Sequence, residues 1–172
     1  MAETTRPKAQ SAGIILRMAA ASYDACILFG VAFVAFIPIV IAEHYVGTVP
    51  DWLKSMLLAA VCYAYFVGFW FKDGATTGMR PWRLRVAMAD SGDSVSLAAA
   101  TARFFAFGIT LVALGMTVFF VLTGQTREPL FFIASGIPIV SMVCLATTPK
   151  RQTLHDLVAG TSVFRVEKPP KK

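Results

Sequence analysis

Two charged side chains interrupt the first long apolar stretch of the sequence, which runs from about residue 14 to residue 42. Arg17 lies near its start and can extend its guanidinium to the lipid headgroups. Asp24 lies about 10 to 15 Å in from the same end, where a carboxylate costs on the order of 2.5 to 3.5 kcal/mol. Proton and ion pathways use such carboxylates, so Asp24 is a candidate ion- or proton-binding residue. The alternative is a buried structural polar network.

The charge of Asp24 needs a partner. A spacing of seven residues places Arg17 and Asp24 on one helix face but about 10 Å apart along the axis, so a direct bond between them would be stretched. We expect Asp24 to face the interior of the protein, where Arg103, Thr110 or water reaches it. The sequence leaves open whether this carboxyl is ionised or protonated, because burial favours the neutral form. Arg17 and Arg103 are the candidate charge partners or gate residues.

A second set of polar residues flanks the apolar stretches and is expected to meet at one mouth of the protein. The set is Thr77, Gly78, Arg80, His155, Asp156, Gly160 and Thr161. A simpler interpretation of part of it is local, because an Asp near the start of a short helix often caps backbone amides. Gly160 would then end that helix.

Two prolines lie inside apolar stretches of the sequence, which otherwise shows no motif for catalysis or metal binding. Pro38 and Pro138 each remove one helical hydrogen bond, which is typical both of gating kinks and of plain packing devices. The three cysteines lie in separate stretches without metal-ligand spacing. The chain carries no phosphate loop or nucleophile elbow and no spacing that offers a nucleophile with a base. We therefore expect no catalytic site, no metal site and no cofactor.

Four stretches are long and apolar enough to cross a bilayer, which takes roughly 20 residues. They cover about residues 14–42, 53–71, 104–122 and 129–148. Of the 172 residues, 56% are hydrophobic and only 15% are charged. Soluble domains carry about 25% charged residues, so the composition excludes an ordinary soluble enzyme domain. The sequence predicts an all-α, four-helix transmembrane bundle embedded in a lipid bilayer.

The basic residues are distributed unevenly among the connecting segments. Fourteen of the 16 Lys and Arg residues lie on one side of the predicted spans, and only Lys54 and Arg127 lie on the other. Cytoplasmic loops retain basic residues, so the sequence predicts both termini in the cytosol. The ends are a tail at 1–13 and a basic tail at 167–172, with the membrane domain at 14–166. This topology accounts for the positive charge, and nucleic acid is not an expected partner.

Two segments outside the spans show the period of two that is typical of a strand. Apolar and other residues alternate at about residues 82–89 and again at 161–167. A single strand is unstable in isolation, so we expect the two segments to pair as a small cytosolic β-strand pair.

These residues together resemble the RDD family, which is named for one arginine and two aspartates. The matching features are Arg17, Asp24, the Thr77-Gly78-x-Arg80 element and the stretch from His155-Asp156 to Ala159-Gly160-Thr161. The resemblance covers about residues 13–166 and makes Asp156 the second aspartate. Met79 stands where the family commonly has a lysine, so Arg80 would have to serve in its place. The resemblance implies a multi-pass protein of the bacterial inner membrane with a suspected role in transport, including sodium/proton exchange.

Two hypotheses of function follow. The first is a small transporter or ion/proton-coupled carrier for a proton or monovalent cation, working as a homo-oligomer because four short spans enclose little space. Asp24 would bind the ion, and Arg17 would set its charge state. The second is a non-transporting membrane scaffold or assembly protein, whose basic tail Lys168–Lys172 binds anionic lipid or a partner.

Overall fold

The computed structural model describes residues 9–166 and contains four long helices. They are α1 (Ile14–Tyr45), α2 (Asp51–Lys72), α3 (Leu97–Leu122) and α4 (Pro129–Thr147). Each is long and apolar enough to cross a membrane. The predicted mostly helical fold with four candidate spans is therefore confirmed.

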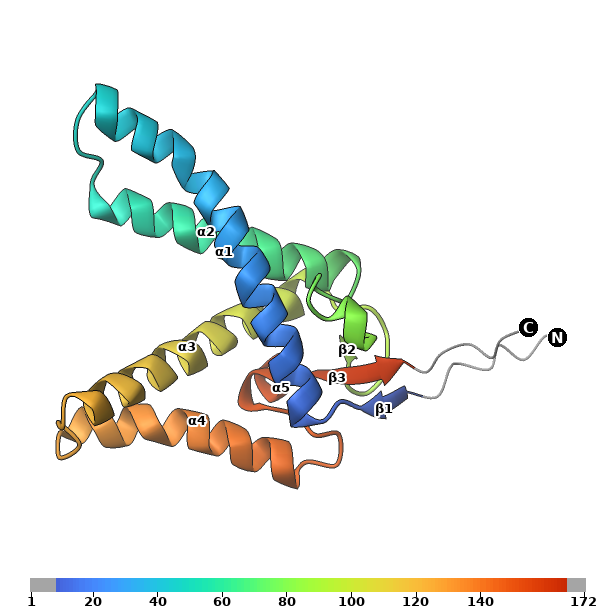
Figure 1. Ribbon diagram of the computed structural model, residues 1–172. Helices are drawn as coiled ribbons and strands as arrows, with labels where there is room; N and C mark the ends of the chain where they lie inside the picture. Colours follow the sequence, from blue (N-terminus) through green and yellow to red (C-terminus); the bar gives the residue numbers. More distant parts are fainter. Residues whose placement is uncertain (1–8, 167–172) are drawn as a thin grey trace.

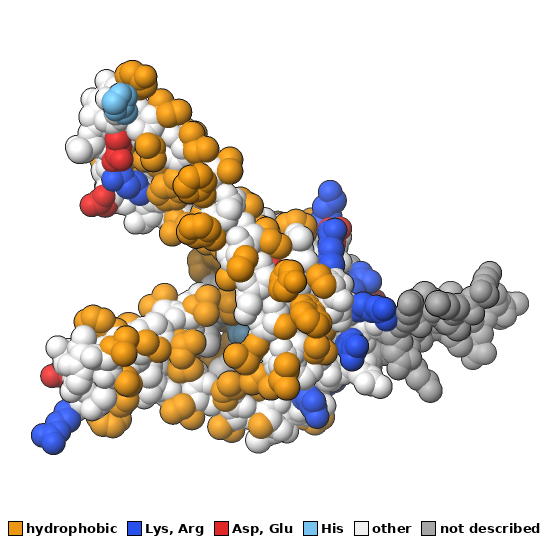
Figure 2. Space-filling view, in the orientation of Figure 1, with side chains coloured by type: hydrophobic (Ala, Val, Ile, Leu, Met, Phe, Trp, Pro, Cys, Tyr) orange, Lys and Arg blue, Asp and Glu red, His pale blue; other side chains and the backbone are white. Residues whose placement is uncertain are grey.

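The four helices form two hairpins that diverge from a common base (Figure 1). One hairpin is α1 with α2, and the other is α3 with α4. Pro50 directly precedes α2 and Pro129 opens α4, positions at which proline costs no helical hydrogen bond. Hydrophobic side chains cover the visible face of both hairpins (Figure 2). Exposed apolar surface on this scale suits lipid and not water, so the chain is a membrane protein.

Helix α3 begins earlier than the apolar pattern predicted. The predicted span started at residue 104, whereas α3 starts at Leu97, directly after Ser96, whose hydroxyl accepts a hydrogen bond from the Ala99 N–H. This cap fixes the helix start seven residues upstream. Arg103, which directly precedes the predicted span, therefore lies inside α3 and is buried.

The predicted strand pair is present and belongs to a three-stranded antiparallel sheet. Strand β2 (Leu84–Met88) pairs with β3 (Thr161–Val166), with Val86 opposite Val163. A third strand, β1 (Ala9–Ser11), pairs with the other edge of β3. Part of the segment predicted as a tail at 1–13 is thus a strand. Residues 1–8 and the predicted tail at 167–172 lie outside the described residues.

The base of both hairpins carries the sheet, and we call this part of the molecule the sheet end (Figure 1). It also contains the short helix α5 (Leu154–Val158) and the one-turn 3₁₀ helix η1 (Arg80–Trp82). A buried apolar cluster holds this end together and includes Trp70, Leu84, Val86 and Val163. The sheet end therefore fixes the positions from which the two hairpins start.

Candidate functional site

Asp24 is buried in α1 and accepts hydrogen bonds from three neutral groups. The Tyr65 hydroxyl donates to its Oδ1 at 2.6 Å, the Thr76 hydroxyl donates to its Oδ2 at 2.5 Å, and the Gly78 N–H donates to Oδ1 at 2.8 Å. Only 5% of Asp24 is exposed. These three donors give each oxygen of the carboxylate at least one hydrogen bond. The contacts join α1 to α2 and to the loop that follows α2.

Gly78 can reach Asp24 because it has no side chain. A Cβ atom at this position would lie 2.5 Å from the Ala20 carbonyl oxygen and 2.7 Å from the Asp24 Cγ. Both distances are shorter than a van der Waals contact, so only glycine lets the loop lie directly against α1. The glycine of the predicted mouth element therefore serves this close approach.

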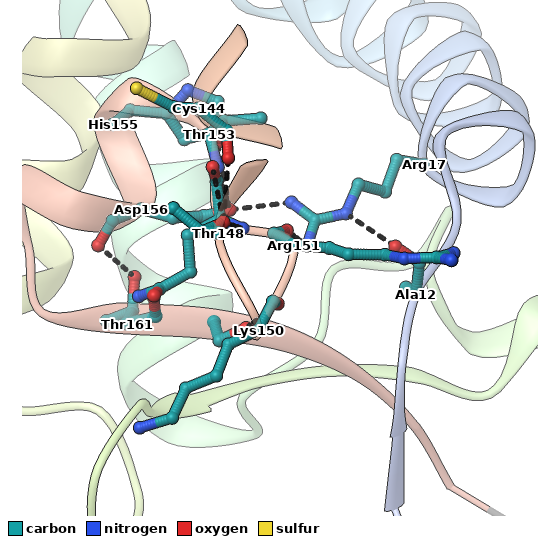
Figure 3. A network of polar contacts seen from close by, with 12 residues as sticks. Ala12, Arg17, Cys144, Thr148, Lys150, Arg151, Thr153, His155, Asp156 and Thr161 are labelled. Carbon is teal, nitrogen blue, oxygen red and sulfur yellow. Dashed lines mark hydrogen bonds and ion pairs between the residues drawn. The ribbon is translucent and has the colours of Figure 1, made fainter. Parts of the chain in front are cut away.

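Asp156 is the centre of a second polar cluster, at the sheet end (Figure 3). It is fully buried and forms ion pairs with Arg17 at 2.6 Å and with Arg103. Thr153 donates to the same carboxylate from its N–H at 3.1 Å and from its hydroxyl at 2.8 Å. The predicted cap at the start of the short helix is present. Asp156 thus caps α5 and also links α1 to α3.

Arg17 also donates hydrogen bonds to two backbone carbonyls, one just before α1 and one just after α4. Its Nε donates to the Ala12 carbonyl at 3.2 Å, and its second terminal nitrogen donates to the Arg151 carbonyl at 2.6 Å (Figure 3). Arg103 also donates to the Thr161 hydroxyl at 2.8 Å. Charge-assisted bonds of this kind are the strong ones in proteins. The cluster therefore ties the start of α1 and the interior of α3 to the α4–α5 connection and β3.

The cluster sets the charge of Asp156 and of its neighbour His155. Burial would raise the pKa of Asp156, but Arg103 and Arg17 outweigh burial and hold this pKa well below its usual range. Burial, with Arg103 beside it, lowers the pKa of His155 to about 3. At neutral pH Asp156 is therefore ionised and His155 is neutral.

The two arginines pair with a different aspartate from the one that the sequence predicted. Arg17 and Arg103 both pair with Asp156, and neither is among the hydrogen-bond partners of Asp24. Thr110 donates to the Ala106 carbonyl of its own helix. The expectation that Arg103 or Thr110 reaches Asp24 is thus wrong. The reason is that Asp156 lies between the two arginines, whereas α2 and the loop after it supply Asp24 with donors.

The remaining predicted residues lie in separate places. Arg80 is exposed and pairs with Asp73 at 2.7 Å, away from both clusters. Thr77 lies beside the Tyr65 hydroxyl. Gly160 follows the C-cap residue Ala159 of α5 and has a φ of +62°, as expected of a glycine that ends a helix. Pro38 and Pro138 lie inside α1 and α4, and both helices continue through them.

A pocket of about 450 Å³ lies between the hairpins near the sheet end. Its walls are mostly apolar side chains from α1, α2, α3 and α4. Four ionisable residues from the two clusters also line it: Arg17, Asp24, Arg103 and His155. Figure 2 shows a hollow between the two diverging hairpins. The pocket thus places the Asp24 carboxylate and both arginines beside one space.

Sequence reasoning missed the donors that surround both aspartates, Tyr65, Thr76 and Thr153. Thr76 directly precedes the Thr77-Gly78 element, and Thr153 stands three residues before Asp156, which is the spacing of a capping box. The capping-box spacing could have identified Thr153 as a partner of Asp156 from the sequence alone. Among residues 9–166, no group of three or more His, Cys, Asp or Glu side chains could hold a metal ion.

Comparison with known protein families identifies the family of this chain. The family model described as the RDD family matches residues 11–160. This range includes Arg17, Asp24, Arg103 and Asp156. No curated protein and no solved structure matches the chain.

Proposed function

This chain belongs to the RDD family, and from that premise we propose that it is a small multi-pass membrane carrier in which a proton or a monovalent cation exchanges at Asp24. The pocket between the hairpins is the space through which Asp24 is reached. The two buried aspartates have different roles in this proposal. Asp24 binds the ion, and Asp156 holds the two hairpins together at the sheet end.

The observation that carries this proposal is the surroundings of Asp24. The carboxylate is buried in a candidate membrane span and lines the pocket, and its hydrogen-bond partners are two hydroxyls and one backbone amide. Asp156, in contrast, has two arginines. An intramembrane carboxylate whose hydrogen-bond donors are neutral is free to bind a proton or a cation, which is how ion pathways use such residues.

The neighbours of Asp24 can bond to its carboxyl group both with and without a bound proton or cation. The hydroxyls of Tyr65 and Thr76 donate to the carboxylate, and each can also accept a hydrogen bond from a protonated carboxyl or offer its oxygen to a cation. Pro38 and Pro138 are the points at which α1 and α4 would bend during exchange, because each removes one backbone hydrogen bond.

The setting we propose follows the distribution of charge. Fourteen of the 16 Lys and Arg residues belong to the segments at the sheet end or to the chain termini, so this end faces the cytosol of a bacterial cell and the protein lies in the inner membrane. A homo-oligomer would enclose more space than four helices alone.

A scaffold or assembly protein is the second candidate function. Each oxygen of both aspartates already has at least one hydrogen-bond donor. A polar network satisfied in this way fixes the helix packing and needs no titration. In this case Asp24 would be a structural residue that joins α1 to α2.

Asp24→Asn separates the two functions because it removes the charge and keeps the shape. The amide oxygen can still accept from Tyr65 and Gly78, and the amide nitrogen can donate to the Thr76 hydroxyl. We expect sealed vesicles with purified wild-type protein to show proton flux that depends on sodium or potassium. The Asp24→Asn protein should lose this flux to background across a pH series.

The matched control is Asp73→Asn, which removes an exposed carboxylate outside the pocket. It should retain wild-type flux. Absence of flux in the wild type, or equal flux in wild type and Asp24→Asn, would refute the carrier and favour the scaffold.

A further inference from the structure

The pocket between the hairpins has two arginines near the sheet end and apolar side chains at its far end. Arg17 and Arg103 lie about 5 and 9 Å from the starts of α1 and α3 at the sheet end, at 1.5 Å per residue. Leu28 and Leu111, on the same two helices, lie about 21 Å from those starts. A ligand that fits this pocket therefore has a polar group at one end and a hydrocarbon at the other.

The charge at the shallow end favours an anion. At the shallow end, Arg17 and Arg103 share the carboxylate of Asp156 and His155 is neutral, which leaves a surplus of one positive charge there. Asp24, which also lines the pocket, lies deeper, about 15 Å from the start of α1. Arginine at a water-poor site is suited to phosphate and carboxylate groups. A negatively charged headgroup would complement this surplus.

Unsatisfied polar nitrogens lie around the same pocket. Among residues 9–166, four buried side-chain atoms have no hydrogen-bond partner, and three of them belong to residues that line the pocket: Trp70 Nε1, Arg103 Nε and His155 Nδ1. Trp70 is 5% exposed and Arg103 is 4% exposed. Buried polar groups are normally paired, so their concentration here indicates a place where a polar ligand group belongs.

We propose that this pocket binds an acidic membrane lipid, with its phosphate at Arg17 and Arg103 and its acyl chain against Leu28, Phe107 and Leu111. The lipid enters from the bilayer through the hollow between the hairpins (Figure 2). A volume of about 450 Å³ holds the phosphate region and part of one chain, within the roughly 300 to 1,000 Å³ that is usual for small-molecule sites.

Lipid binding goes beyond the proposed ion exchange and does not require it. A lipid in this pocket would lie beside Asp24, so it is also a means by which the membrane would control access to that residue. Lipid retention measures binding alone. A negative result in that experiment therefore leaves the ion flux unaffected, and absence of ion flux leaves lipid binding unaffected.

The test is lipid retention in native mass spectrometry of the purified full chain. The protein is equilibrated in micelles with equal amounts of phosphatidylglycerol and phosphatidylcholine and then released from detergent. We expect the wild type to retain phosphatidylglycerol in preference to phosphatidylcholine by at least about tenfold, which corresponds to about 1.4 kcal/mol. Equal retention of the two lipids would overturn the proposal.

Ala25→Phe fills the pocket without altering a charged residue. Ala25 lies on α1 next to Asp24 and lines the pocket, and its outer surface is exposed. The matched control is Ala60→Phe, an exposed position on α2 that does not line the pocket. We expect Ala25→Phe to lose the retained phosphatidylglycerol and Ala60→Phe to keep it. Equal retention by both variants, whose folding is compared by circular dichroism, would place the lipid elsewhere and overturn the proposal.

Discussion

The two buried aspartates hold their charge in different ways. Asp156 is neutralised by two guanidiniums, so its burial is compensated by ion pairs that reach α1 and α3. Among residues 9–166, the hydrogen-bond donors to Asp24 are neutral groups of Tyr65, Thr76 and Gly78. Removing one member of a buried ion pair leaves an uncompensated charge, whereas removing the charge from a site of neutral donors does not. The same Asp→Asn change should therefore cost more stability at Asp156 than at Asp24.

Asp156→Asn tests this difference as a change in stability. The variant leaves Arg17 and Arg103 close together without the carboxylate between them. We expect the free energy of unfolding in detergent to fall by about 3 to 5 kcal/mol, the usual cost of breaking a buried pair. Asp24→Asn should cost less. Denaturant or thermal unfolding followed by circular dichroism measures both.

Asp73→Asn serves as the control for the loss of an ion pair in general. Its pair with Arg80 is exposed, and such surface pairs contribute about 0 to 1 kcal/mol. If Asp156→Asn were no more destabilising than Asp73→Asn, the buried cluster would not hold the hairpins together.

The helices and the central strand pair could be predicted because each is encoded locally. Apolar stretches of about 20 residues predicted the spans, and alternation predicted β2 and β3. The start of α3 could not be read from hydropathy, because the cap at Ser96 lies outside the apolar stretch. Strand β1 has only three residues, too few for a period, and it exists because the edge of β3 is there to pair with it.

The partners of the site residues depend on contacts between distant elements. Arg17 and Asp156 are 139 positions apart, and Asp24 and Thr76 are 52 apart. Helix periodicity shows which residues share a face, and it correctly made a direct bond between Arg17 and Asp24 unfavourable. It cannot show which of two aspartates an arginine meets, because that depends on where α5 packs against α1 and α3.

Gly78→Ala tests the contact between α1 and the loop after α2. The new methyl group would collide with the Ala20 carbonyl oxygen and with Asp24, and backbone atoms have little room to move. We expect a loss of about 1 to 3 kcal/mol in the free energy of unfolding, as for other overpacked sites. Gly108→Ala is the matched control, since a Cβ there meets nothing within 4 Å. It should be neutral or stabilising by about 0.5 to 1 kcal/mol, because alanine favours a helix.

At the scale of the whole molecule, the sheet brings the ends of the described chain together. Ala9 pairs with Val166, and the β2 strand between the hairpins pairs with the other edge of β3. In the topology that we propose, β1, β2, β3 and α5 lie on one side of the membrane and both hairpin turns lie on the other. The basic residues of the sheet end are the reason for proposing that this side is the cytosol.

Cysteine labelling of spheroplasts tests this topology. Cys26, Cys62 and Cys144 are first replaced by alanine, and one cysteine is then introduced at exposed Thr48, Ser94 or Gln125. A thiol reagent that cannot cross membranes should label the variants at Thr48 and Gln125, which lie in the two hairpin turns, in intact spheroplasts. It should label the variant at Ser94, on the sheet side, only after lysis. The reverse pattern would invert the proposed orientation. Labelling of Thr48 and Gln125 on opposite sides would contradict four spans, because both turns follow a helix that leaves the sheet end.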